Sequence, residues 1–345
     1  MASVRSKLIN MVTRTAMALL SRTRKPPVKY RAQVARIDAR RRKPLPAGIS
    51  TEDVEGRVPG RWIQNSAATS KQTILYLHGG AFIMRLPEGH TGMVANFCAD
   101  ADVCAFMAWY RLAPEHPFPA APEDCLAAYR SLLDAGHEAR DIVVMGDSAG
   151  GNLVLVLLHL IGRAGLPMPA GAIAISPITD FAQISATWRL NTWRDPLYRL
   201  QGIVNPVEHY VQGRASPVDP LVSPYYGDLS GFPPLFFMVG GVEALLDDSI
   251  GMARKAVEQG VPTRVQIWAG MPHVFVLQEA LPETRHARRE IAGWLVSLRE
   301  PRARSEPLYR SCVEVFDLAP LTGVLRRETN DVFLDVRQVR SGDAR

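Results

Sequence analysis

Short, mostly apolar runs recur along the chain and are separated by stretches with helical spacing. The runs at 73–77, 142–145 and 235–239 are nearly all apolar, as expected for strands buried on both faces of a parallel sheet. Strands are predicted within 51–64, 72–77, 103–109, 142–145, 172–176, 235–239 and 263–268. Helices are predicted at 89–101, 122–135, 149–163, 247–259 and 281–298. This alternation predicts an α/β fold: a doubly wound, mostly parallel central sheet with helices on both faces.

Two regions interrupt the alternation. Residues 180–225 are rich in aromatic residues, Pro and Arg, and a long insertion of this kind usually forms a lid or cap. Residues 301–345 follow the last predicted helix and contain an alternating stretch at 332–336 that is compatible with a strand. We therefore divide the chain into an N-terminal segment (1–45), a catalytic domain (46–300) with its insertion at about 180–225, and a C-terminal extension (301–345) of unknown role.

Charge is distributed unevenly. Residues 1–43 hold 13 Lys and Arg and one acid, whereas residues 44–345 hold 27 basic and 33 acidic residues. A nucleic-acid-binding domain would carry its basic stripe on the fold, so the mildly acidic body argues against nucleic acid as a partner.

Within the basic segment, residues 8–20 form an amphipathic pattern that is too short to span a bilayer and lacks an A-x-A cleavage site. This N-terminal helix either packs on its own domain as part of a cap or makes weak contact with a membrane surface.

The four cysteines are scattered and make no C-x-x-C pair. Cys98, Cys104, Cys125 and Cys312 also lack neighbouring His clusters, so a structural zinc site is not indicated. Reduced thiols of this kind fit a cytoplasmic location. No metal or cofactor is expected.

The sequence Gly146-Asp147-Ser148-Ala149-Gly150 is a G-x-S-x-G motif between a predicted strand and a predicted helix. In that context the motif forms a tight turn that presents the serine as a nucleophile. The following helix directs its N-terminal amides and positive dipole end toward a developing oxyanion. Ser148 is the predicted nucleophile.

A second motif, His78-Gly79-Gly80-Ala81, follows the strand at 73–77. Glycines allow the backbone to approach a substrate closely, so the amides of Gly79, Gly80 and Ala149 are the expected oxyanion-hole donors. His78 and Asp147 are expected to support this arrangement, His78 by orienting the loop.

A serine nucleophile needs a base, and His273 is the histidine that follows a late strand and precedes the last helix. In the order Ser…Asp/Glu…His, the acid lies between Ser148 and His273. Glu243 is the first carboxylate after the strand at 235–239, with Asp247 as the alternative.

Together these motifs resemble the hormone-sensitive-lipase family of α/β-hydrolase serine esterases. The most specific part is residues 110–124, YRLAPEHPFPAAPED, and the segments GDSAGG (146–151) and DPLVSP (219–224) also match. The chain differs in having HGGA where many members have HGGG, and Glu where Asp is the commoner acid.

The resemblance, which covers roughly residues 30–300, implies an α/β-hydrolase fold with a helical cap made by residues 1–45 and part of 180–225. It also implies a cis peptide bond at Ala113-Pro114 or Phe118-Pro119, and several members of the family are homodimers. Trp188, Trp193, Tyr198 and Tyr210 are candidates to line the substrate pocket.

These features predict a serine carboxylesterase that hydrolyses small, short-acyl esters without a cofactor. Two alternatives stay open at this stage. One is a lactone or acetylated natural-product hydrolase that uses the same three residues. The other, of a different class, is a non-catalytic ligand-binding receptor on the esterase fold. The sequence does not identify the natural substrate.

Overall fold

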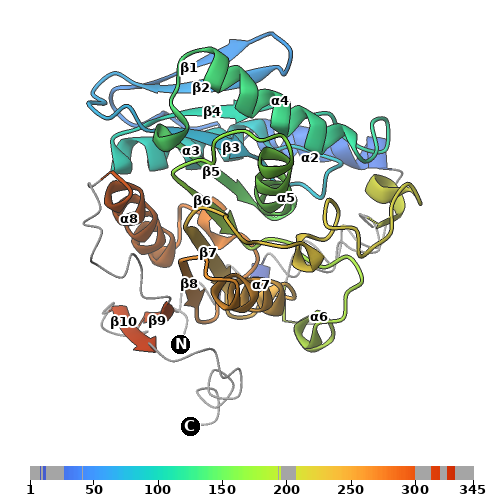
Figure 1. Ribbon diagram of the computed structural model, residues 1–345. Helices are drawn as coiled ribbons and strands as arrows, with labels where there is room; N and C mark the ends of the chain where they lie inside the picture. The colour runs from blue at the N-terminus through green and yellow to red at the C-terminus, as the bar shows by residue number, and fades with distance from the viewer. Residues whose placement is uncertain are drawn as a thin grey trace.

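The computed structural model describes residues 8, 11–12, 27–40, 42–192, 194–195, 207–299, 312–318 and 325–330. Its strands form one sheet in the order β1-β2-β4-β3-β5-β6-β7-β8-β9-β10 (Figure 1). Neighbours from β4 to β9 are parallel, whereas β1, β2 and β10 pair antiparallel to their neighbours. The predicted doubly wound, mostly parallel sheet is confirmed.

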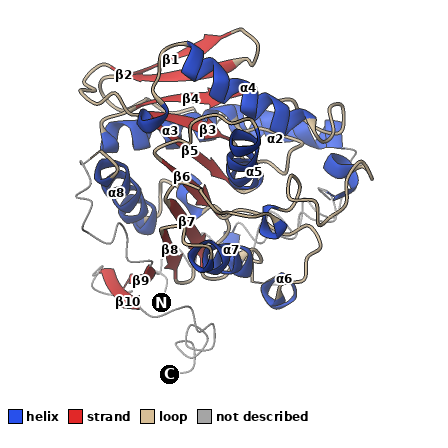
Figure 2. Ribbon diagram, in the orientation of Figure 1, coloured by secondary structure: helices blue, strands red, loops and turns tan. Residues whose placement is uncertain are grey.

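The strands lie close to the predicted segments. Their bounds are β1 Ile49–Val54, β2 Gly60–Asn65, β3 Thr73–Leu77, β4 Cys104–Ala108, β5 Ile142–Asp147, β6 Gly171–Ile175, β7 Leu235–Gly240, β8 Thr263–Trp268, β9 Cys312–Leu318 and β10 Leu325–Asn330. Every residue of β3, β5, β6 and β7 is buried, because helices cover both faces of the sheet (Figure 2).

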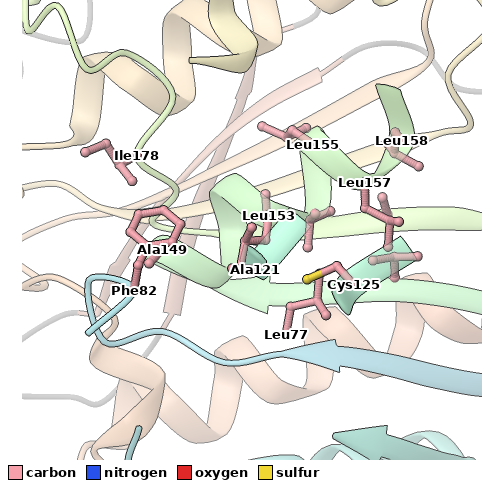
Figure 3. Packing of buried hydrophobic residues seen from close by; sticks show 14 of the residues in the cluster. Leu77, Phe82, Ala121, Cys125, Ala149, Leu153, Leu155, Leu157, Leu158 and Ile178 are labelled. Atoms are coloured by element: carbon pink, nitrogen blue, oxygen red, sulfur yellow. The ribbon is translucent and has the colours of Figure 1, made fainter. Parts of the chain in front are cut away.

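The helices are α2 Pro27–Ala39, α3 Pro87–Ala101, α4 Ala120–Asp134, α5 Ala149–Arg163, α6 Ala186–Leu190, α7 Leu246–Glu258 and α8 Pro282–Ser297. Helices α4, α5 and α7 pack in one hydrophobic cluster, and α3 and α8 pack in a second cluster on the other face. Helix α5 is apolar almost all round because it lies deep in the first cluster, where Leu153 and Leu157 meet Leu77 of β3 and Cys125 of α4 (Figure 3).

The chain reverses its direction across the sheet between β3 and β5. From β3 it proceeds to β4 on one side and then returns to β5 on the other side. In open α/β sheets, ligands bind at such a switch point, beyond the carboxyl ends of the strands. The loops after Leu77 and Asp147 therefore meet where a site is expected.

Helix α2 packs on the domain through two ionic anchors. Asp38, which is 1% exposed, accepts the amide hydrogens of Glu88 and Gly89 at 2.8 and 3.0 Å, at the start of α3. Arg31 binds Glu115 through two nitrogens and also donates to the Ile83 carbonyl at 2.7 Å.

Of the amphipathic stretch before α2, only residues 8, 11 and 12 are described, and these are helical and exposed. None of the helices in the described residues is both long and apolar enough to cross a membrane.

The described parts of the insertion at 180–225 contain α6, a π-helical turn at Val207–Val211 and a 3-10 turn at Pro224–Tyr226. Short 3-10 turns also occur at Ala139–Asp141 and Phe275–Leu277. The peptide bonds Ala113-Pro114 and Phe118-Pro119 are both cis, as the family resemblance implies.

The C-terminal segment contributes to the sheet, which the sequence pattern did not reveal. Strand β9 pairs parallel with β8, and Phe316 stacks on Trp268 with ring centroids 4.5 Å apart. Arg264 of β8 forms ion pairs with Glu290 and with the buried Glu314. The stretch at 332–336, considered above as a strand, lies outside the described residues.

Candidate active site

Ser148 sits on the turn that joins β5 to α5. Its φ of 54° and ψ of −117° are strained for a residue with a side chain. The turn is tight enough that a Cβ at Gly146 would lie 2.6 Å from the Leu77 carbonyl oxygen, and a Cβ at Gly150 would overlap that oxygen. The two glycines of the motif are thus required by close backbone packing, and they fix the direction of Ser148.

Ser148, His273 and Glu243 form a hydrogen-bonded chain. Nε2 of His273 lies 2.9 Å from Ser148 Oγ, and Nδ1 lies 2.9 Å from Glu243 Oε2. The three side chains come from the turn after β5, the loop after β8 and the loop after β7, which all end at the same edge of the sheet. Glu243 is fully buried, whereas the His273 side chain is 16% exposed. The carboxylate therefore meets the histidine out of contact with bulk water.

The second oxygen of Glu243 is also held. Oε1 accepts the Ser176 hydroxyl and the Gly240 amide, both at 2.6 Å. Ser176 Oγ in turn accepts the Val274 amide at 3.2 Å, next to His273. Ser176 thus links the loop of Glu243 to the loop of His273.

Burial and nearby charge shift the pKa of His273 in opposite directions. Burial by itself lowers its pKa, but the hydrogen bond and the charge of Glu243, with smaller contributions from Asp195 and Asp147, raise the pKa above its ordinary value. The surroundings therefore stabilise the protonated imidazole, which is what a base that accepts a proton during reaction requires.

The loop at 78–84 follows β3 and is held by Asp147. The Gly79 amide donates to Asp147 Oδ1 at 2.9 Å, and the Tyr76 hydroxyl donates to the same oxygen at 2.5 Å. Nε2 of His90 lies 3.2 Å from it. Burial raises the pKa of Asp147, but the charge of His90 and these hydrogen bonds outweigh that effect and hold the pKa below its usual range.

This arrangement changes the set of backbone amides that are available as oxyanion-hole donors. The Gly79 amide, expected from the sequence to point toward a substrate, points to Asp147 instead. Within the described residues, the amides of Gly80, Ala81 and Ala149 donate to no protein acceptor. Ala81 has a φ of 53°, a conformation that places it in the tight turn closed by the Ile83 and Met84 amides on the Gly80 carbonyl.

His78 is a structural member of this loop. Its Nδ1 lies 2.7 Å from the Gly79 carbonyl oxygen, and its ring stacks on Tyr110 with centroids 4.1 Å apart. The Tyr110 hydroxyl donates to the His78 carbonyl at 2.5 Å. Burial, with the charges of Arg85 and His90, holds the pKa of His78 well below its ordinary value, so this ring stays neutral.

The four aromatic residues considered for the pocket have different positions. Tyr210 is buried and stacks flat on Phe82, with ring centroids 3.9 Å apart. Trp188 is also buried, but its indole donates to Asp248 at 3.1 Å and so packs against the start of α7. Trp193 and Tyr198 lie outside the described residues. Figure 3 shows Phe82 in the same region as Ala149, and both belong to one hydrophobic cluster.

Asp247, the alternative acid, is turned toward the insertion. Its carboxylate accepts the Thr187 amide at 3.0 Å, whereas Glu243 bonds to His273. No group of three or more His, Cys, Asp or Glu side chains in the described part of the chain is arranged to hold a metal ion. Cys98, Cys104 and Cys125 are free thiols.

Reasoning from the sequence missed Ser176, Tyr76 and His90. Ser176 is the last residue of the predicted strand at 172–176 and follows directly after the observed β6, so its place at a carboxyl end of the sheet was the available signal. Nothing in the sequence points to Tyr76 or His90, which reach Asp147 from the middle of a strand and from a helix.

Comparison with known proteins shows the family of this chain. Residues 74–277 match the model of a family described as having the alpha/beta hydrolase fold. An acetyl-hydrolase of Streptomyces hygroscopicus is 37% identical over 249 residues, which are 71% of this chain and 82% of that protein. An esterase of Acinetobacter venetianus is 32% identical over 253 residues, 73% of this chain and 80% of that protein.

Solved structures show the same similarity. An esterase from the bacterial hormone-sensitive lipase family superposes with a TM-score of 0.80 and 33% identity, covering 87% of this chain and all of that chain. The chain therefore belongs to the alpha/beta hydrolase fold family and, within it, to the hormone-sensitive-lipase family of esterases. It is a carboxylic ester hydrolase.

Proposed function

We propose that this protein is a serine carboxylesterase that hydrolyses small, short-acyl esters. Ser148 is the nucleophile, His273 the general base and acid, and Glu243 the carboxylate that orients the histidine. The observation that carries the proposal is the pair of 2.9 Å hydrogen bonds that join these side chains at a strained turn after β5.

The reaction proceeds in two halves. Ser148 Oγ attacks the ester carbonyl carbon while His273 Nε2 accepts the hydroxyl proton, and the carbonyl oxygen becomes an oxyanion. Nε2 then gives the proton to the leaving alkoxide, which departs as the alcohol and leaves an acyl-enzyme. A water attacks the acyl carbon, passes its proton to Nε2, and the proton returns to Oγ as the carboxylic acid leaves.

The oxyanion is stabilised by backbone amides. We assign this role to Gly80, Ala81 and Ala149, because these amides have no acceptor in the described residues. Ala149 follows Ser148 in the chain, and the loop of Gly80 and Ala81 begins at His78, whose backbone packs closely against Gly150. Gly79 has a different role, since its amide anchors the loop on Asp147. Loss of one such donor typically costs about 2.7–4 kcal/mol of transition-state stabilisation.

The preference for small acyl groups rests on two observations. Phe82, Phe181 and Tyr210 are buried against one another beside the 78–84 loop, so aromatic rings fill the space on that side. The relative from Streptomyces hygroscopicus is named as an acetyl-hydrolase. Both favour an acyl group of a few carbons.

The test is hydrolysis of p-nitrophenyl esters from acetate to palmitate by the wild type, Ser148→Ala and Ser131→Ala. Ser131 is an exposed serine on α4 whose hydroxyl bonds only within its helix, so this variant is the matched control. We expect wild type and Ser131→Ala to prefer short chains, and Ser148→Ala to lose a factor of about 10⁴ or more in kcat.

Three results would contradict the proposal. Equal activity in Ser148→Ala would exclude the serine mechanism. Folded wild type that hydrolyses none of these p-nitrophenyl esters but does hydrolyse lactones or acetylated natural products would belong to the alternative substrate class inferred from the sequence. Tight binding of such compounds without turnover would indicate a receptor.

A further inference from the structure

A cluster of arginines lines a hollow beside the 78–84 loop. Two adjoining cavities of about 440 and 490 Å³ share Arg57, Arg111 and Asp124 as lining residues. None of the three residues of the proposed mechanism lines either cavity. We propose that this hollow is a second binding site, which takes a small organic anion through its phosphate or carboxylate groups.

The hollow carries more positive than negative charge. Its five arginines are Arg31, Arg57, Arg85, Arg111 and Arg130, and its three carboxylates are Glu115, Glu123 and Asp124. Those carboxylates are already engaged, because Arg31 binds Glu115, and Arg111 binds both Asp124 and Glu123. Among the described residues, Arg57, Arg85 and Arg130 have no carboxylate partner.

Arg85 lines the second cavity and is half-buried. Its guanidinium lies 5.5 Å from the centroid of the Trp109 ring and donates to the Tyr110 carbonyl at 3.1 Å. Burial lowers the pKa of Arg85, and the nearby charge of Arg31 adds to this effect. A half-buried guanidinium with a carbonyl as its acceptor gains a stronger, charge-assisted hydrogen bond when an anion enters.

Trp109 is held in place to form one wall. Arg61 lies over its ring at 5.8 Å, and this arginine is in turn bound to Asp53 by two hydrogen bonds of 2.7 and 2.8 Å. The other lining residues include Pro59 and Leu112, which offer apolar surface. The hollow thus combines guanidinium groups that have no carboxylate partner among the described residues with an aromatic ring and apolar carbon. This combination suits the anionic and carbon parts of one small molecule.

The shape and the charge favour a small anion over a polyanion. Cavities of this volume hold a compact ligand. The excess of 33 acidic over 27 basic residues in 44–345 disfavours an extended nucleic acid or an anionic membrane as the ligand.

The test is isothermal titration calorimetry of the full chain with inorganic phosphate, pyrophosphate and citrate at constant ionic strength. The variants are Arg85→Gln and, in case that change disturbs folding, Arg130→Gln, which lies on α4. Arg140→Gln is the matched control, since Arg140 is an exposed arginine that pairs with Glu138 away from the hollow. We expect one site per chain, at least about tenfold weaker binding in each hollow variant, and unchanged binding in Arg140→Gln.

Binding that is equal in wild type, Arg85→Gln and Arg130→Gln would overturn the proposal, as would absence of binding by all three anions. Binding only to anionic vesicles or DNA would also overturn it, because a polyanion surface would then account for the arginines. The measurement needs no turnover, so its failure is distinguishable from failure of the proposed esterase mechanism.

Discussion

Asp195 accepts a hydrogen bond from the Ala244 amide at 3.1 Å, directly beside the carboxylate that holds His273. The same segment makes further bonds to that loop: Asn191 donates to the Glu243 carbonyl at 2.8 Å, and the Thr187 hydroxyl donates to the Ala244 carbonyl at 3.0 Å. The insertion between β6 and β7 therefore supports the loop of the proposed catalytic acid from about fifty residues away in sequence.

Replacing Asp195 should change the pH dependence of the enzyme. The charge of Asp195 raises the pKa of His273, so in Asp195→Asn that pKa falls. The histidine must be neutral to act as base, and the acid limb of the kcat/KM profile should therefore move to lower pH. Profiles between about pH 5 and 9 would measure this.

Asp195→Glu is the control for this effect. It retains the charge, so the acid limb of its kcat/KM profile should lie close to that of wild type. A variant that loses kcat equally at every pH, with the acid limb unmoved, would show that Asp195 acts only by holding the loop.

The two candidate acids can be separated by mutation. Glu243→Gln keeps the size of the side chain but replaces the acceptor of His273 Nδ1, so the imidazole takes the wrong tautomer and kcat should fall by about 10⁴. Asp247→Asn should stay within a few-fold of wild type, because Asp247 bonds to Thr187 and not to the histidine. Steady-state kinetics on p-nitrophenyl acetate would decide, and the reverse pattern would make Asp247 the acid.

The buried Asp248 should make stability depend on pH. Burial, reinforced by the charge of Asp180, raises the pKa of Asp248 to about 7, although amides of Thr179 and Asp180 and the Trp188 indole lower it. Below its unfolded pKa of 3.8 the group is protonated in both states. Between that value and about 7 only the folded state holds the proton, so stability falls as pH rises through this window, by at most about 4 kcal/mol.

Asp248→Asn removes this titration and leaves the Trp188 indole facing an amide nitrogen, a cost of about 1–3 kcal/mol. In urea unfolding from about pH 4 to 8, the free energy of unfolding of the variant should lie furthest below that of wild type at low pH and closest to it at high pH. Trp188→Phe keeps the carboxyl group of Asp248, so its free energy of unfolding should still fall as pH rises. Parallel curves for wild type and Asp248→Asn would contradict the raised pKa.

Helix α2 should contribute to stability through Asp38. In Asp38→Ala two amides at the start of α3 lose their acceptor, as in loss of a helix cap, and the free energy of unfolding should fall by about 0.5–2 kcal/mol. Glu138→Ala removes an exposed ion pair with Arg140 and should change stability by less than about 1 kcal/mol. Equal unfolding midpoints for wild type and Asp38→Ala would show that α2 is not held by this carboxylate.

Much of the fold follows from the sequence pattern. The runs at 73–77 and 142–145 are apolar because both faces of these strands are covered, and this pattern locates the loops that follow them. The glycines around Ser148 also predict the tight turn, because that turn leaves no room for a Cβ at these positions. The strands β9 and β10 gave no such signal, because β9 takes its place by pairing with β8, which ends 44 residues before β9 begins, and β10 pairs with β9.

The sequence by itself determined the parallel sheet, and it predicted the positions of the proposed nucleophile and base and the strand end from which the proposed acid comes. Each of these depends on periodicity or on a short motif. Only the tertiary structure decided which carboxylate meets His273, which amides stay open to an oxyanion, and which residues hold both loops. Asp147 engages Gly79, Ser176 bridges two loops, and Asp195 reaches the acid from the insertion. These contacts join residues far apart in sequence, and no local pattern encodes the distance or direction of a hydrogen bond between them.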